Sequence, residues 1–459
     1  MTLRDRLQRL TEGNLIGAVV VLVGGTAVAH GVTAAALPIV TRLYSPADFS
    51  VLAVFAGLLS IASVAACLRF DLAIPIPEQD SQAADLLALA LSCTVGVAAV
   101  VAAAVLLVPT TLIGRFTPPG LGHWLWLLPV AVLLAGSYSA LQMWFLRKKA
   151  FMAISHSRVA QSSAAAGTQL GMGWMGLAPL GLILGQMLNT GAGCAILGYG
   201  LLKRDRDAVR AVTLARMRSA FAAYDRFPKY STLEALCNSA SIQLPIVVIA
   251  AVSIGPEAGY LALAMTAMQI PMGLIGTAVS QVYLSRAPEE HRAGRLDEFT
   301  TSVFGGLLRS GVGPLVFVGL VAPALFPLLF GTAWHRAGVL VAWMTPWFIM
   351  QFVSVPVSMA LHITGHQRAA FVLQVFALVL RMGAVYGASL VAVQSVSEAY
   401  AISGAVFYLA YLLTVLVVVS ARPAPVVQAI WRATPIVLVW AGAALVVALA
   451  ARGLGLTTA

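Results

Sequence analysis

The residues with the most chemical potential in this sequence of 459 residues are arginines inside long apolar stretches. Arg381 stands near the middle of one stretch and Arg309 in the first half of another, while Arg158 and Arg69 lie nearer the ends of theirs. A guanidinium at the centre of a bilayer costs about 2.5–3.5 kcal/mol on insertion scales, so we interpret Arg309 and Arg381 as facing an internal cavity. For Arg69 and Arg158, extension of the side chain toward the membrane surface is an equally good interpretation.

Acidic side chains do not offset these arginines at depth. Asp71, Asp85 and Glu234 fall near the ends of apolar stretches on one side, and Glu398 falls near an end on the other side. A cationic cavity without a deep acid is complementary to an anion, and arginine suits phosphate because its fork donates two parallel hydrogen bonds. An exporter of cations driven by protons or sodium is expected to use a deep acid, so the pattern favours a phosphate-bearing substrate.

Motifs for other chemistry are absent from the sequence. It contains no Walker A, HExxH or GxSxG pattern, and no GxGxxG that opens a strand-turn-helix unit. The seven histidines are dispersed, and the four cysteines are scattered through apolar stretches without a CxxC pair. We therefore predict no catalytic residues, no metal site and no cofactor.

The amino-acid composition indicates the class of protein in which these arginines lie. Apolar residues make up 60% of the chain and charged residues only 10%, against roughly 25% charged in ordinary soluble domains. A soluble enzyme and a disordered chain are both excluded, which leaves a multi-pass membrane protein. The net charge of +11 would suggest nucleic acid in a soluble protein, but here the basic residues stand between apolar stretches, and we predict no nucleic-acid partner.

Apolar segments long enough to cross a bilayer, which needs about 20 residues, recur along the whole chain. The predicted spans are 15–40, 50–70, 84–108, 123–146, 152–174, 176–200, 230–252, 258–283, 301–326, 337–362, 369–391 and 397–420, and 433–451 could be a further one. No segment shows sustained strand alternation. We predict an all-α integral membrane protein with twelve core transmembrane helices, arranged as two six-helix lobes around a central cavity, and a 13th helix at the C-terminus.

Basic residues orient these spans, because Lys and Arg concentrate on the cytoplasmic side. On one side fall Arg4, Arg6, Arg9, Arg147, Lys148, Lys149, Lys203, Arg204, Arg206, Arg210, Arg216, Arg218, Arg226, Lys229, Arg286, Arg292, Arg295, Arg368, Arg422 and Arg432. On the other side lie only Arg42, Arg115, Arg336 and Arg452. The asymmetry predicts a cytoplasmic N-terminus.

A weak internal repeat divides the chain. The tetrapeptide Leu-Pro-Ile-Val occurs at 37–40 and again at 244–247, and each copy precedes a proline-containing turn and a new helix. We predict an N-terminal lobe over 1–202, a basic cytoplasmic linker over 203–229, a C-terminal lobe over 230–420 and an extension over 421–459. Apolar residues interleave with arginines in the linker, which suggests an interfacial helix, although a solvated linker fits equally well.

Short motifs then resemble those of a known family. They are residues 41–49 (TRLYSPADF), 68–77 (LRFDLAIPIP), Leu141-Gln142 with Arg147-Lys148 and Phe151, 157–162, 227–230, 243–245 and 276–283. In this order and spacing the chain resembles the Wzx-type lipid-linked oligosaccharide flippases of the multidrug/oligosaccharidyl-lipid/polysaccharide exporter superfamily. It departs from their pattern at Ser50, where glycine is usual, and at Asp71, where glutamate is common.

The resemblance implies a flippase rather than an enzyme. It would move undecaprenyl-diphosphate-linked oligosaccharide from the cytoplasmic to the periplasmic leaflet of the bacterial inner membrane, for surface polysaccharide such as lipopolysaccharide or exopolysaccharide. Its partners would be the lipid-diphosphate-linked oligosaccharide, membrane lipids, and polysaccharide polymerase and chain-length proteins. The expected substrate-binding residues are Arg309, Arg381, Arg158, Arg69, Asp71, Lys229 and Arg42.

The sequence leaves three competing functions open. A drug or cation exporter of the same superfamily would need a deep acid. An integral-membrane polymerase or ligase of sugars would need a sizeable external catalytic loop. A major-facilitator transporter would carry a glycine-Asp-Arg signature between its second and third helices, where this chain has Pro75, Pro77, Glu78 and Asp80.

Overall fold

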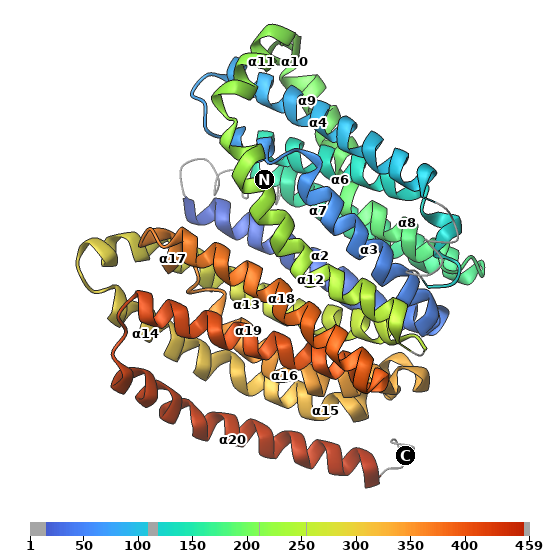
Figure 1. Ribbon diagram of the computed structural model, residues 1–459, viewed down its shortest axis with the longest axis vertical. Helices are drawn as coiled ribbons and strands as arrows, with labels where there is room; N and C mark the ends of the chain where they lie inside the picture. The colour runs from blue at the N-terminus through green and yellow to red at the C-terminus, as the bar shows by residue number, and fades with distance from the viewer. Residues whose placement is uncertain (1–14, 109–117, 211, 254, 454–459) are drawn as a thin grey trace, which may run out of the picture. The chain divides into compact units, whose positions relative to one another are not determined.

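The computed structural model describes residues 15–108, 118–210, 212–253 and 255–453 (Figure 1). The described residues form helices joined by turns and contain no strand, which confirms the predicted all-α fold class. Four arginines of the orientation argument, Arg4, Arg6, Arg9 and Arg115, lie outside the described residues.

Contacts divide the chain into two compact units. The first unit comprises Met1–Tyr44 and Val51–Gln243, and the second comprises Ser45–Ser50 and Leu244–Ala459. The first contains α2 (Leu15–Leu43), most of α3 (Pro46–Ala66), η1 (Phe70–Ala73), α4 (Asp80–Leu107), η2 (Leu121–Trp124), α6 (Leu127–Arg147), α7 (Phe151–Trp174), α8 (Leu180–Gly191), α9 (Gly193–Arg204), α10 (Arg206–Arg210), α11 (Leu214–Ala223) and η3 (Phe227–Ser231).

The helix α12 (Thr232–Val252) continues from the first unit into the second. The second unit then contains α13 (Glu257–Arg292), α14 (Leu296–Leu307), η4 (Leu308–Val312), α15 (Gly313–Phe330), η5 (Thr332–Trp334), α16 (His335–Ser354), α17 (Ala360–Ile363), α18 (Gln367–Val391), η6 (Val393–Ser395), α19 (Val396–Val418) and α20 (Pro423–Gly453).

Eleven helical segments in the described part of the chain are long and apolar enough to cross a membrane. They include α20, the predicted last span. Two predicted spans, α7 and α13, are not among the eleven. In α7 the polar residues His156, Arg158 and Gln161 lower the hydropathy of the helix. The fold is therefore that of a multi-pass membrane protein, and the exact number of spans stays a prediction.

Small residues bring the helices of the first unit together. Gly25 of α2 lies so close to α7 that a Cβ there would be 1.9 Å from Ser155 Oγ. Gly136 of α6 leaves similarly little room beside Thr94 of α4. Helices in membranes associate through such close backbone approach, because lipid tails remove the hydrophobic driving force that operates in water.

The motif at residues 41–49 is the start of α3. Ser45 donates from its backbone N to Asp48 Oδ2 over 2.8 Å, and its Oγ contacts the same oxygen at 2.7 Å. The Asp48 backbone N in turn donates to Ser45 Oγ over 3.3 Å. With Pro46 as the first helical residue, this is a capping box, which satisfies backbone donors that the first turn of a helix leaves open.

The start of α13 packs directly on this motif within the second unit. The Gly259 backbone N donates to Ser50 Oγ over 2.9 Å, so the serine that departs from the family pattern has a defined partner. A Cβ at Gly259 would stand 2.1 Å from the carbonyl oxygen of Pro46. Only glycine fits where the two helix starts meet this closely.

Two details of the span assignment are wrong. The helix α3 ends at Ala66 rather than at residue 70, and Arg69 lies in the turn that follows, with a positive φ of 61°. The predicted span 337–362 is too long, because α16 ends at Ser354 and Pro356 lies in the turn that follows it. Helix ends are the least predictable feature of a sequence pattern.

Candidate functional site

Arg381 lies inside the second unit, enclosed by aromatic rings. Its side chain on α18 is only 1% exposed, and its guanidinium carbon is 5.0 Å from the ring centroids of both Trp347 and Phe407 and 5.8 Å from that of Tyr408. Its guanidinium also forms a hydrogen bond with the Tyr408 hydroxyl. A cation held over desolvated aromatic faces gains about 2 kcal/mol or more, which accounts for much of how this charge is tolerated at depth.

Arg309, by contrast, is exposed. It stands in η4, the π-helical segment between α14 and α15, and its Nε donates to the Gly305 carbonyl over 3.2 Å. The side chain lines a pocket of about 310 Å³ together with Arg422 and Arg432 from the region of α20. Three guanidinium groups therefore share one pocket.

Arg158 is half-buried in α7 and connects that helix to α2. Its Nη1 donates to Thr26 Oγ1 over 2.6 Å. The ion pairs of the described residues include none with Arg158, so its partner in the structure is a neutral hydroxyl. Its charge stays available to an anion.

The turn after α3 holds Arg69 and Asp71. Asp71 is 4% exposed, and its Oδ2 accepts a hydrogen bond from Ser139 Oγ over 2.6 Å. Its Oδ1 and the Arg69 Nε are buried atoms without a hydrogen-bond partner among the described residues. Asp71 is therefore more deeply enclosed than its predicted place near a helix end suggested.

The last two predicted residues lie near helix ends. Lys229 in η3 pairs with Asp225 over 2.5 Å, although its side chain is 63% exposed. This hydrogen bond lowers the pKa of the Asp225 carboxyl below its usual range. Arg42 is exposed in the last turn of α2.

The seven predicted residues are thus divided between the two units. Arg42, Arg69, Asp71, Arg158 and Lys229 belong to the first unit, and Arg309 and Arg381 belong to the second. Sequence reasoning treated Arg422 and Arg432 only as topology markers. The signal that could have indicated a site is that both stand beside the start of the last apolar segment, where arginine side chains face the polar edge of a membrane.

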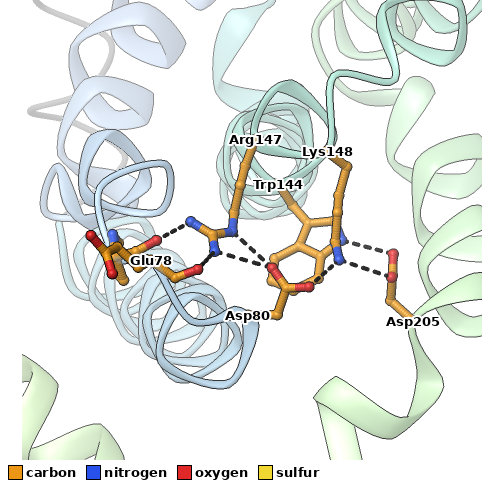
Figure 2. Close-up of polar contacts among 7 residues, drawn as sticks. Glu78, Asp80, Trp144, Arg147, Lys148 and Asp205 are labelled. Atoms are coloured by element: carbon orange, nitrogen blue, oxygen red, sulfur yellow. Dashed lines mark hydrogen bonds and ion pairs between the residues drawn. The ribbon is translucent and has the colours of Figure 1, made fainter.

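A second polar cluster in the first unit was not predicted. Figure 2 shows Asp80, at the start of α4, between Arg147 and Lys148 at the end of α6. Asp80 Oδ1 is 3.1 Å from Arg147 Nη2, and Lys148 Nζ is also 3.4 Å from Asp205 Oδ1. The Trp144 indole donates to Asp205 Oδ2 over 3.1 Å. The cluster holds the ends of α4, α6 and α9 together.

The cluster also includes backbone carbonyl groups, and it affects the protonation of Lys148. Arg147 also donates to the carbonyl oxygens of Pro77 and Glu78 in the turn before α4. The hydrogen bond to Asp80 raises the pKa of Lys148 above its ordinary value. Both basic side chains of the cluster have acidic partners within it, so its role is to fix helix ends.

The family profile described as "Polysaccharide biosynthesis protein" matches residues 39–338. A search of curated proteins gives no match.

Solved structures share the fold. The chain is similar to a structure titled lipid II flippase MurJ in an inward closed conformation, with a TM-score of 0.69 and 11% identity over 95% of this chain and 97% of that one. It is also similar to inward-facing and outward-facing structures of a multidrug resistance MATE family transporter of the MOP superfamily, each at 14% identity. The inward-facing structure has a TM-score of 0.59 and covers 87% of this chain and 94% of that one. The outward-facing structure has a TM-score of 0.54 and covers 90% and 97%. At these identities the likeness establishes the fold.

Proposed function

The chain belongs to the polysaccharide biosynthesis protein family, and from this premise we propose that it moves undecaprenyl-diphosphate-linked oligosaccharide from the cytoplasmic to the periplasmic leaflet by alternating access. The family match over residues 39–338 is the observation that carries the proposal. It is supported by a fold of transporters and flippases rather than of enzymes. The membrane would be the bacterial inner membrane, with the N-terminus in the cytoplasm, and the product would serve lipopolysaccharide or exopolysaccharide.

The arginines supply the chemistry that such a substrate requires. A diphosphate needs charged hydrogen-bond donors. Arg158 and Arg309 have accessible side chains that, among the described residues, bond only to neutral oxygens. Arg69 adds a buried Nε that lacks a partner, beside Asp71. In this proposal each of these groups binds the diphosphate while the lipid tail stays in the bilayer.

The remaining predicted residues have narrower roles in the proposal. Arg381 is enclosed, so its contact with substrate requires the aromatic rings of α16 and α19 to move away from it. Lys229 would collect the anionic head at the cytoplasmic mouth by exchanging its bond to Asp225. Arg42 would act at the external exit. Polymerase and chain-length proteins would receive the product there.

Transfer across reconstituted vesicles tests this function. Vesicles with the purified protein and an undecaprenyl-diphosphate oligosaccharide should expose the sugar to an added glycosidase faster than empty vesicles do. We expect Arg158→Ala and Arg309→Ala to reduce the rate to the empty-vesicle level, because each removes a charged donor. Arg368→Ala, at an exposed arginine of α18, is the matched control and should keep the wild-type rate. Equal rates with and without wild-type protein would refute the function.

Asp71 favours a second candidate. An exporter of cations or drugs needs a buried acid, and Asp71 is buried with one carboxylate oxygen unpartnered. The fold similarity to MATE transporters supports the same alternative. Resistance of expressing cells to cationic dyes, lost on Asp71→Asn, would favour this candidate over the lipid-linked substrate.

A further inference from the structure

The pocket that Arg309 shares with α20 is a binding site in its own right. We propose that it holds the phosphate of an anionic membrane phospholipid, and that the C-terminal helix α20 exists in part to complete it. The pocket has a volume of about 310 Å³. Its polar lining includes Arg309, Thr301 and Ser302 on one wall and Arg422, Gln428 and Arg432 on the other.

One face of α20 packs on other helices of the second unit. In the second unit α20 runs along α14, η4 and α15 (Figure 1). A Cβ at Gly313 would stand 2.2 Å from Trp440 Cδ1, so the glycine makes room for the indole. The Trp440 ring also meets that of Phe317 edge-to-face, with centroids 5.7 Å apart. These contacts hold the arginines of α20 in register with Arg309.

The charge of the pocket suits a phosphate. Three guanidinium groups line it, and no ion pair among the described residues joins any of them to the two acids that also line it, Asp297 and Glu298. Those acids occupy the first turn of α14, where the helix dipole stabilises negative charge. The guanidinium groups therefore remain available to a ligand, and Arg forks match phosphate oxygens in geometry and charge.

The depth of the pocket matches a lipid headgroup. The 31 residues of α20 extend about 46 Å, some 16 Å more than the hydrocarbon core of about 30 Å. Arg432 lies about 14 Å from the start of the helix. If the excess length is shared equally between the two ends, this residue lies about 5 Å inside the edge of the hydrocarbon core. An arginine side chain reaches back over that distance to the level of the phosphates.

Apolar side chains beside the pocket favour a lipid over a soluble anion. Val427, Ile430 and Trp431 are exposed on α20 within two turns of the pocket arginines. Acyl chains can lie on this surface while the phosphate enters the pocket, and tryptophan commonly occupies the same membrane interface. A free phosphate would gain nothing from these residues.

The inference does not rest on the proposed function, because any protein of this fold meets the same phospholipids. Arg309 also belongs to the predicted substrate site, so the test uses Arg422 and Arg432. The purified full chain is titrated in non-ionic detergent with phosphatidylglycerol, and binding is counted by native mass spectrometry. We expect one phosphatidylglycerol to bind preferentially over zwitterionic phosphatidylcholine, and the double variant Arg422→Gln/Arg432→Gln to weaken this binding by about tenfold or more, as expected for lost charged hydrogen bonds.

Matched variants exclude a general effect of charge. Arg286→Gln/Arg292→Gln removes two exposed arginines at the end of α13, just before α14 begins, and should bind phosphatidylglycerol as the wild type does. Arg422→Lys/Arg432→Lys should keep part of the affinity. Wild-type binding by the Gln double variant, or equal loss in the α13 variant, would overturn the proposal. A wild-type protein that takes undecaprenyl diphosphate in this pocket but not phosphatidylglycerol would also overturn it and would assign the pocket to the substrate path.

Discussion

Arg381 and Arg309 are both arginines of the second unit, but their surroundings give them different capacities. Arg381 has aromatic faces on several sides and almost no access from outside, while Arg309 opens into a pocket with two other arginines. Their places along the apolar segments could be predicted, because a charge in such a segment is conspicuous. Their surroundings could not, since the rings around Arg381 come from two other helices, α16 and α19, and the partners of Arg309 come from the C-terminal segment.

Replacement of Arg381 tests its aromatic cage. We expect Arg381→Leu to lower the free energy of unfolding by about 2–4 kcal/mol, because the cation–π contacts and the bond to Tyr408 are lost. Thermal unfolding of the detergent-solubilised protein measures the effect. Arg368→Leu, at an exposed position of the same helix, should change stability little. Equal stability of the two variants would contradict a structural contribution from the cage.

The helices α3 and α13 begin in similar ways. Proline stands at each start, as the first residue of α3 (Pro46) and as the residue just before α13 (Pro256), and the two starts meet at Ser50 and Gly259. The sequence repeat indicated that these turns correspond. It did not indicate that they touch, because contact between distant segments depends on packing that no local pattern contains.

Gly259→Ala tests this contact. The new Cβ would meet the Pro46 carbonyl oxygen, so the helices must move apart, and we expect a loss of about 1–3 kcal/mol. Gly276→Ala lies in the same helix with nothing within 4 Å of the added Cβ, and should be neutral or stabilising. Thermal unfolding distinguishes the two. A Gly259→Ala protein as stable as Gly276→Ala would show that the starts are not tightly packed.

The cluster around Asp80 predicts a dependence on pH. The hydrogen bond to Asp80 raises the pKa of Lys148, so its contribution to stability is complete below the ordinary value of 10.5 and is lost as the pH rises through the higher folded value. The pair is partly exposed, and we expect about 0.5–1 kcal/mol. The thermal stability of Lys148→Met should lie below that of the wild type at neutral pH, with the difference vanishing in alkali. Lys149→Met, at the exposed neighbour, should follow the wild-type profile throughout.

For the whole molecule, the fold class and multi-pass character could be predicted from composition and segment length alone. The division into lobes at 1–202, 203–229, 230–420 and 421–459 stays a prediction, as does the side of each terminus. The role of the C-terminal segment could not be predicted from the sequence. Its apolar residues indicate a helix, but they do not indicate which other helices it packs against. The close contact between Trp440 of α20 and Gly313 of α15 shows that α20 packs against α15.

The packing of α20 predicts the position of the C-terminus. The pocket joins the first turns of α14 and the start of α20, so we expect both helices to begin at one membrane face and α20 to end at the opposite one. With a basic face in the cytoplasm, alkaline phosphatase fused after Ala459 should be active in the periplasm. The same reporter fused after Ser420 should be inactive, and green fluorescent protein should show the reverse. A cytoplasmic C-terminus in the full chain would contradict a crossing by α20.

The low apolarity of α7 bears on how the protein is made. Insertion machinery accepts a segment when its summed transfer energy favours lipid, and an arginine opposes entry by up to about 2.5–3.5 kcal/mol, the value at the centre of a segment. On its own, α7 is expected to insert poorly. In the structure, Thr26 of α2 accepts a hydrogen bond from the Arg158 guanidinium, and Gly25 of α2 lets the two helices approach closely. The ribosome must add the whole of α3, α4 and α6 before α7 emerges. We therefore expect α2 to stay close to the site of insertion during that interval, and we expect its deletion to reduce the insertion of α7 into the bilayer.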